Sequence, residues 1–451
     1  MLERNQAQEL SQEILKRCGK EPAELFLFHK EHSLTRFANN SIHQNVAEYN
    51  LTIYLRLLVG KRLGMASTNR VEPATLDELV SRARANAAAS PEDPDFPGLA
   101  EPANYSAINS FDQATANYSP ELRAEQVGIV CSLANDKGLN ASGAFSTGVN
   151  GISIANSQGL FAYHNITEAD FQTVVMSDDS SGRAQASGWK AEEIDGEAIG
   201  REAIHKAEQG LNPRHVEPGE FTVILDPYVT DDLVENLNEH GMGGRTVMDG
   251  RSWMNDRIGE QIMSPQVSIW DDGLNPEGMP MPFDSEGVPK QKVVIVNQGV
   301  AISPVYDRYT AGKAGTSSTG HALPPYFPAF MHAIGPIGLN LFMAPGEASL
   351  EDMIRSTKKG LYITRFWYTR LVHPRDCIVT GMTRDGVFMV ENGEIAYPVK
   401  NLRFTQSYVG ALANVETIGS DTRLLKSEYG NYAKCVPALK LNGFNFTGVT
   451  V

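Results

Sequence analysis

The most constraining feature of this sequence is a long run of alternating residues near its start. Between Ala23 and Thr68, β-branched and aromatic residues alternate with polar ones, as they do in half-buried β-strands. Turn-forming residues interrupt the run at Asn39, Asn40 and Gly60. Because these interruptions are short, the pattern predicts successive strands that fold back on one another as an antiparallel meander.

Helical patterns surround this meander. Residues 1–20 mix charge with apolar residues at helical spacing, which is typical of an amphipathic helix rather than a signal peptide. Another helix is predicted over residues 75–88, where Thr75 and Glu78 have the spacing of a capping box. The remaining predictions for this half are helices near 119–138 and 196–210, strands over 142–177 and an exposed loop over 90–105.

Two prolines, Pro213 and Pro218, mark the expected boundary between two domains at about residue 216. We therefore predict an α+β fold. Residues 1–216 are expected to form a mixed α/β domain with an antiparallel sheet. Residues 217–451 are expected to form a β-dominated domain with few helices, one of them over 231–240.

Short patterns in this second half predict individual strands. Asp385-Gly386 and Asn392-Gly393 each lie between apolar runs, a pattern typical of two-residue hairpin turns. The segment YITRFWYTR, residues 362–370, alternates as a strand does. Burial of its aromatic side chains explains this alternation without a ligand.

Charge and cysteine usage exclude several classes of function. The formal net charge is −15 and there is no basic patch, so we expect no direct contact with nucleic acid or anionic membranes. No apolar run is long enough to cross a bilayer. The cysteines Cys18, Cys131, Cys377 and Cys435 are widely scattered, which argues against a disulfide scaffold and a zinc ribbon. A cytoplasmic protein is expected.

The stretch LVENLNEHGMGGR, residues 233–245, is the first candidate for chemistry. It belongs to a predicted helix that Thr230 can cap and Gly241 can end. Asp231 and Asp232 then lie in the first turn, where the helix dipole favours anions. On this interpretation the acidic residues have a structural explanation.

The alternative for the same stretch is a metal site at Glu235 and His240. Residues five apart point about 140° from each other on a regular helix, so they converge on one ion only if the helix contains a π-bulge. Glu235 and Glu239 share a face more naturally. The choice is therefore between a weak metal site and a solvated acidic face that ends in a histidine.

A second candidate is the loop AGTSSTGHALPP, in which hydroxyl side chains precede His321. A nucleophile needs a base within hydrogen-bond reach and a third group that orients the base, and the sequence supplies no such group. There is also no G-x-S-x-G elbow. A polar loop that lines a groove fits better, with Ser318, Thr319 and His321 as candidate substrate-binding residues.

Several longer stretches resemble the TldD/PmbA family, whose members are also called modulators of DNA gyrase and are grouped with metallopeptidases. The matching stretches occur in the family's order and cover nearly the whole chain. They are LTRFANNSIHQNV, GRSWMNDRIGEQIMSPQVSIWDDG, PFDSEGVPKQKVVIVNQGVAISPVYDRYTA and CIVTGMTRDGVFMVENGEIAYPVKNLRFTQSYVGALANVETIG.

The resemblance implies a degenerate metal motif. Active family members carry His-Glu-x-x-x-His on a helix, and counting back from Gly259-Glu260 places Glu235 on the first His. Asn236 then replaces the catalytic Glu, and His240 matches the second His. The family's third ligand is a cysteine near the C-terminus, for which Cys435 is the local candidate, although it lies a few residues too late. Asn236 cannot take up a proton, so a catalytic base is missing.

The resemblance therefore implies a member of the branch without the motif, similar to the TldE subunit that pairs with an active TldD. We expect it to bind extended or unfolded peptides, as a homodimer or as a heterodimer with a motif-bearing subunit. No cofactor is expected in this chain; zinc is implied only if the motif still functions, or in the partner. The alternatives are a self-sufficient metal-dependent peptidase that uses Glu235 and His240, and a regulatory protein that binds gyrase or another partner.

Overall fold

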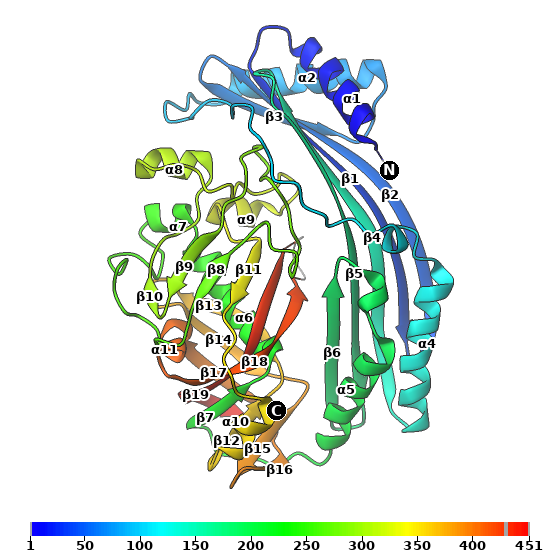
Figure 1. Cartoon of the computed structure of the whole chain (residues 1–451), viewed down its shortest axis with the longest axis vertical. Coiled ribbons are helices and arrows are strands. Elements are labelled where there is room, and N and C mark those ends of the chain that lie inside the picture. The colour runs from blue at the N-terminus through cyan, green and yellow to red at the C-terminus, as the bar shows by residue number, and fades with distance from the viewer. Residues whose placement is uncertain (1, 428–431, 450–451) are drawn as a thin grey trace.

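The computed structural model describes residues 2–427 and 432–449, and it confirms the α+β fold class. Within these residues there are two β-sheets, one formed by the N-terminal half of the chain and one by the C-terminal half. The long strands of the first sheet run along one side of the molecule, and the second half of the chain lies against them (Figure 1). None of the helices in the described ranges combines the length and the apolar character needed to cross a bilayer.

The first sheet contains the predicted meander. Its strand order is β3-β2-β1-β4-β5-β6, and all its strand pairs are antiparallel. Asn39 and Asn40 both adopt a positive φ, 51° and 56°, and form the tight turn between β1 and β2. The strands are β1 (Ala23–Ala38), β2 (Ser41–Val59), β3 (Arg62–Thr68), β4 (Asn140–Asn156), β5 (Phe161–Met176) and β6 (Ser181–Gly188).

Helices cover one face of this sheet. Leu25 and Leu27 of β1 pack against α1 and α2, whereas Phe26 on the opposite face contacts the second half of the chain. Helix α2 begins earlier than predicted because Pro73 occupies its first turn, so Glu72 rather than Thr75 is the N-cap residue. The helices are α1 (Arg4–Cys18), α2 (Pro73–Ala89), α3 (Gln113–Ala116), α4 (Pro120–Asp136), η1 (Ala191–Glu193) and α5 (Gly196–Gln209).

The second sheet is mixed rather than purely antiparallel. Strand β7 pairs in parallel with β12 and antiparallel with the long strand β19, so β7 is central. The strands are β7 (Glu220–Leu225), β8 (Ile269–Asp271), β9 (Val293–Asn297), β10 (Val300–Ala301), β11 (Asn340–Met343), β12 (Lys359–Ile363), β13 (Phe366–His373), β14 (Ile378–Thr383), β15 (Val387–Glu391), β16 (Glu394–Pro398), β17 (Leu402–Ser407), β18 (Val415–Lys426) and β19 (Ala433–Val449).

Short helices fill the connections of this half, and the largest hydrophobic core lies between them and the sheet. The helix predicted over 231–240 is thus one of several in the described part of the chain. They are α6 (Pro227–Leu237), the π-helical turn η2 (Asn238–Met242), α7 (Gly244–Met248), α8 (Arg308–Ala314), α9 (Ala329–Ile334), α10 (Leu350–Arg355) and α11 (Tyr408–Ala413).

Of the two predicted hairpin turns, one is confirmed and one is wrong. Asn392-Gly393 joins β15 to its antiparallel partner β16. Asp385-Gly386 connects β14 and β15, which do not pair with each other. Here Asp385 is buried, and its carboxylate accepts hydrogen bonds from Ser181 and Arg365, each at 2.7 Å. The polar contacts of this side chain, rather than a hairpin, therefore explain its place in the turn.

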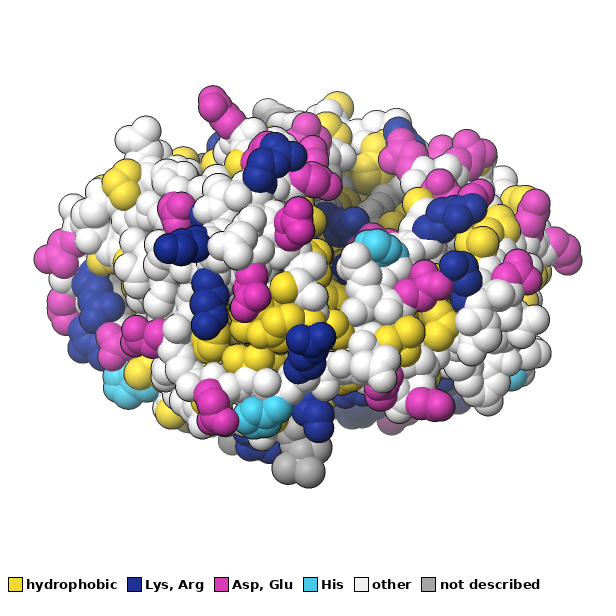
Figure 2. Space-filling view, turned by 90° about the horizontal axis from the view of Figure 1, so that it is seen from below, with side chains coloured by type: hydrophobic (Ala, Val, Ile, Leu, Met, Phe, Trp, Pro, Cys, Tyr) yellow, Lys and Arg dark blue, Asp and Glu magenta, His cyan; other side chains and the backbone are white. Residues whose placement is uncertain are grey.

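Buried polar contacts join the two halves. The Tyr228 hydroxyl accepts a hydrogen bond from the backbone N–H of Gln185 and donates one to the carbonyl oxygen of the same residue. The Lys426 ammonium pairs with the buried Glu168 carboxylate of β5. Viewed from the lower end of Figure 1, hydrophobic side chains gather at the centre of the face, among basic and acidic ones (Figure 2).

Candidate functional site

Helix α6 carries the degenerate motif and begins where the central strand β7 ends. Asp226 is its N-cap and accepts a hydrogen bond from the backbone N–H of Tyr228, while Pro227 occupies the first helical position. The predicted cap at Thr230 is therefore wrong, because that residue lies fully buried inside the helix. Asp231 consequently lies beyond the first turn, so the helix dipole does not explain it.

The end of α6 is distorted. From Asn238 to Met242 the chain forms a π-helical turn, and Gly241 lies inside this turn instead of ending the helix. The π-type distortion that a metal site at Glu235 and His240 would require is therefore present. Because a π-turn adds a residue to the helical repeat, Glu235 and His240 both line the same cavity although they are five residues apart.

This cavity has a volume of about 820 Å³ and lies over the motif helix. Residues of α6 and η2 form one side, and residues of β13 form another. Arg183 and Gln185 of β6, the end of β18 and the exposed Phe330 of α9 also line the cavity. Strands β13, β18 and β6 are all edge strands within the described sheets, so edge strands of both sheets contribute to the lining of the cavity.

The acidic side chains of the motif helix are held by hydroxyl groups. Asp232 accepts hydrogen bonds from Thr369 and Tyr408, both at 2.7 Å. Glu235 accepts from Ser427 at 2.7 Å and from Tyr432 at 2.6 Å, and Glu239 accepts from the same tyrosine at 3.0 Å. These residues therefore do not form a solvated acidic face.

The fully buried Lys434 of β19 supplies the positive charge of this acidic cluster, which consists of Asp231, Asp232, Glu235 and Glu239. Its Nζ lies 3.2 Å from the Asp231 carboxylate and 3.5 Å from that of Glu235. Lys434 and the hydroxyl donors outweigh burial at Glu235 and lower its pKa. Burial raises the pKa of Asp231 and Glu239 to about 7 and that of Asp232 to about 6.

The other motif residues do not complete a metal site. The Asn236 side chain is turned back on its own helix and donates to the Asp232 carbonyl oxygen at 3.0 Å. Burial, with Arg251 nearby, lowers the pKa of His240 to about 4, so the imidazole is neutral. Cys435 follows Lys434 on β19, and because adjacent strand residues point to opposite faces, its thiol points away from the cluster.

A catalytic zinc ion therefore does not fit these residues. Such a site needs about three protein ligands and a base near the bound water. Within the described ranges no three His, Cys, Asp or Glu side chains converge closely enough to hold a metal. An ammonium group lies among the carboxylates instead.

Strand β13 contributes aromatic and basic side chains to the cavity, and burial does not explain them. Tyr368 is 64% exposed and has a positive φ of 56°. The Arg370 guanidinium lies 4.6 Å from its ring, and that of Arg365 lies 4.5 Å from the ring of Trp367. The prediction that burial accounts for this segment is wrong for Trp367 and Tyr368, which face the cavity.

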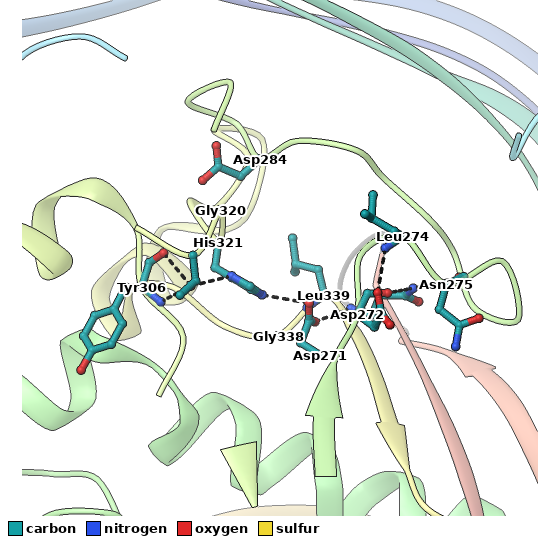
Figure 3. Close-up of polar contacts among 12 residues, drawn as sticks. Asp271, Asp272, Leu274, Asn275, Asp284, Tyr306, Gly320, His321, Gly338 and Leu339 are labelled. Atoms are coloured by element: carbon teal, nitrogen blue, oxygen red, sulfur yellow. Dashed lines mark hydrogen bonds and ion pairs between the residues drawn. The ribbon is translucent and has the colours of Figure 1, made fainter. Parts of the chain in front are cut away.

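The candidate residues of the hydroxyl-rich loop lie elsewhere, against β8 (Figure 3). His321 is fully buried; its Nε2 lies 2.8 Å from Asp271 and its Nδ1 lies 2.9 Å from the Thr319 hydroxyl. Asp271 is thus the orienting group that the sequence did not reveal. The Thr319 hydroxyl also bonds to both backbone groups of Tyr306, and Ser318 donates to the carbonyl oxygen of that residue. These contacts fix the loop, and none of the three loop residues lines the large cavity.

Two features of the candidate site were missed by sequence reasoning. Lys434 directly precedes the cysteine that was weighed as a ligand, and its position inside a long apolar strand was a signal, since a lysine there needs a buried carboxylate partner. The exposed aromatic residues of β13 gave no such signal, because their alternation also fits a buried strand.

Comparisons with known proteins agree with this architecture. The sequence matches the PmbA/TldA metallopeptidase domain 1 over residues 23–87, the central domain over 72–211 and the C-terminal domain over 218–448.

Individual relatives carry metalloprotease, TldD or TldE names. A metalloprotease of Methanothermobacter thermautotrophicus is 27% identical over 69% of this chain and 67% of its own length. A metalloprotease TldD homolog of Haemophilus influenzae is 23% identical over 82% of this chain and 79% of its own. The crystal structure of TldE from Thermococcus kodakarensis has the same fold, with a TM-score of 0.87, 20% identity and coverage of 98% of this chain and 100% of that one.

Proposed function

The chain belongs to the PmbA/TldA metallopeptidase family, and we propose that it acts there as a peptide-binding subunit without a complete metal site. In this proposal an extended or unfolded peptide binds in the large cavity. A partner subunit that carries the intact motif supplies hydrolysis. In a heterodimer, the partner is a second family member that cleaves the peptide. In a homodimer neither chain carries the intact motif, so the protein binds the peptide without cleaving it.

The observation that carries the proposal is the edge of β13 along the cavity. Among the described strands, β13 pairs only with β14, so its other edge has no strand partner. A peptide that adds to such an edge gains backbone hydrogen bonds that do not depend on its sequence. This mode of binding suits unfolded substrates.

The side chains around this edge favour a peptide over a small apolar ligand. Trp367 and Tyr368 offer flat aromatic surfaces, and Arg370 adds a donor for carbonyl or carboxylate groups. On the opposite side, Glu239 can accept a hydrogen bond from a peptide N–H or ammonium group. Because Asn236 cannot serve as a base, cleavage is assigned to the partner.

Peptide binding is tested with a fluorescein-labelled unstructured peptide and fluorescence anisotropy. Two N-methylated versions of the peptide are compared. One carries methyl groups on the odd-numbered residues and the other on the even-numbered residues. In an added strand only every second residue directs its N–H to the neighbouring edge, so one version should bind at least tenfold more weakly than the other. Equal affinities of the two versions, or no binding of the parent peptide, would contradict the proposal.

A matched pair of variants locates the site. Tyr368→Ala should weaken binding about tenfold, because an aromatic contact contributes about 1.5 kcal/mol. Tyr49→Ala removes a similarly exposed tyrosine, 57% against 64%, from the distant strand β2 and should leave affinity unchanged. If both variants bind like the wild type, the peptide does not use this cavity.

The role of a partner is tested by cleavage. The purified chain alone should not cleave the peptide, whereas a mixture with a motif-bearing homologue should, and Tyr368→Ala should slow the mixture. Cleavage by the homologue alone at the same rate would remove the need for this chain.

A self-sufficient metallopeptidase is the second candidate, favoured by the π-helical turn that brings Glu235 and His240 to one cavity. It requires chelator-sensitive cleavage by the chain alone that is lost in His240→Ala. That result would replace the first proposal.

A further inference from the structure

The side chain of Lys434 lies against the carboxylates of the motif helix that line the cavity. It is fully buried, and its ammonium lies within ion-pair distance of Asp231 and Glu235. The ring of Tyr432 lies 5.1 Å from the same nitrogen. A lysine is almost never fully buried unless its charge is paired, so these contacts hold the charge in place.

Hydroxyl groups donate hydrogen bonds to several of the carboxylate oxygens in the acidic cluster. Asp232 is used by Thr369 and Tyr408, and the Oε1 atom of Glu235 is used by Ser427 and Tyr432. Oδ1 of Asp231 and Oε2 of Glu235 are not used by these hydroxyl groups, and they are the carboxylate oxygens that lie within ion-pair distance of the Lys434 Nζ. A divalent ion in this cluster would need those same oxygens.

The ammonium also changes the charge that an incoming ion meets. A divalent cation at the same carboxylates would lie a few ångströms from a positive charge in a site of low dielectric, where repulsion is strong. The neutral His240 adds no negative charge, and the Cys435 thiol is on the other face of its strand. The Lys434 ammonium therefore already occupies the position beside these carboxylates that a metal cation would need.

We propose that Lys434 is the resident cation of the motif cavity and closes it to divalent metals. The inference concerns the same cavity as the proposed function but does not depend on peptide binding. It gives a physical reason why Asp231 and Glu235 lie together in a chain whose donor set does not fit zinc. Removal of the lysine should open the carboxylates to a metal.

The test is calorimetric titration with Mn²⁺ and Zn²⁺, combined with elemental analysis of the dialysed protein. The wild type should bind neither ion at the cluster. Lys434→Met should bind one divalent ion per chain at least tenfold more tightly than the wild type, and a second change, Glu235→Gln, should abolish the gain. Lys440→Met is the control, since it removes another buried lysine from β19 that pairs with the more exposed Glu416; it should not bind metal.

Several outcomes would overturn the inference. One is stoichiometric metal in the wild type that is lost in Glu235→Gln or His240→Ala, and this measurement needs no lysine variant. Another is a folded Lys434→Met protein that binds no metal. If Lys434→Met does not fold, Lys434→Gln is titrated instead, because its neutral amide keeps a hydrogen-bond donor beside the carboxylates. A folded Lys434→Gln protein that binds no metal would also overturn the inference. Peptide anisotropy on the same samples separates this result from the proposed function.

Discussion

The replacement of Asp271 by Asn tests the buried contact that fixes the hydroxyl-rich loop. Asp271 is fully buried, and its carboxylate accepts hydrogen bonds from Nε2–H of His321 at 2.8 Å and from the backbone N–H groups of Leu339 and Asn340 at 2.7 and 2.8 Å. A hydrogen bond to a charged group contributes about 1.5–3 kcal/mol. An asparagine keeps one acceptor oxygen but presents an NH₂ group to donors, so we expect a loss of about 3–5 kcal/mol.

The loss should depend on pH. Burial raises the pKa of Asp271, but His321, Lys290 and the backbone donors outweigh burial and lower it. A carboxyl group with a lowered folded-state pKa stabilises the protein above its unfolded pKa, and this contribution disappears as the pH falls. The difference between wild type and Asp271→Asn should therefore be full at pH 7 and shrink below about pH 4.

Unfolding in urea is followed by the fluorescence of the neighbouring Trp270, and hydrogen exchange reports on the amides of Leu339 and Asn340. Asp272→Asn is the control. The Asp272 side chain is 18% exposed, accepts a hydrogen bond from the backbone N–H of Leu274 at 3.2 Å, and lies 3.8 Å from the Lys292 ammonium. This replacement should cost less than about 1 kcal/mol. Equal losses in both variants, or unchanged amide protection in Asp271→Asn, would refute the reasoning.

Three further predictions follow from single contacts. Gly393→Ala should lose about 1–3 kcal/mol in urea unfolding, because Gly393 has a φ of 86° and a Cβ there would lie 2.7 Å from the Arg355 carbonyl oxygen; wild-type stability would contradict this. Glu168→Gln should lose about 3 kcal/mol at pH 7, since Lys426 outweighs burial and lowers the pKa of Glu168 to about 2; the difference should fade as the pH falls from about 4 toward 2, and a constant difference would be evidence against the ion pair. Tyr368→Gly should raise stability by up to about 1 kcal/mol while weakening peptide binding, because it relieves a positive φ; a less stable variant would show that the tyrosine contributes packing.

Local patterns predicted the fold where turn chemistry and strand pairing agree. Asn39 and Asn40 tolerate the left-handed backbone, so the first hairpin follows from the sequence, and the Asn392-Gly393 hairpin follows for the same reason. Asp385-Gly386 has the same sequence signature, but the hairpin predicted there is not formed. Its carboxylate is used by Ser181 and Arg365, which are distant in sequence, and no local pattern records such partners.

The motif helix shows the same limit. Its existence was predictable, but its start was placed at Thr230 because the sequence does not reveal that Asp226 ends a central strand. The sequence connected a π-bulge only with a metal site, whereas the structure contains the π-helical turn beside a set of residues that does not fit zinc. The side chains beside the turn are held by residues far away in the sequence: the Tyr432 hydroxyl contacts both Glu235 and Glu239.

The sequence by itself determined the family and the α+β class, because turn residues, strand patterns and the order of the matching stretches are properties of the chain. The tertiary structure decided which side chains meet. It placed the Lys434 ammonium beside the carboxylates and Tyr368 in the lining of the large cavity. Burial and pairing of charges depend on elements far apart in the sequence, so the charge of this cavity is a property of the folded protein alone.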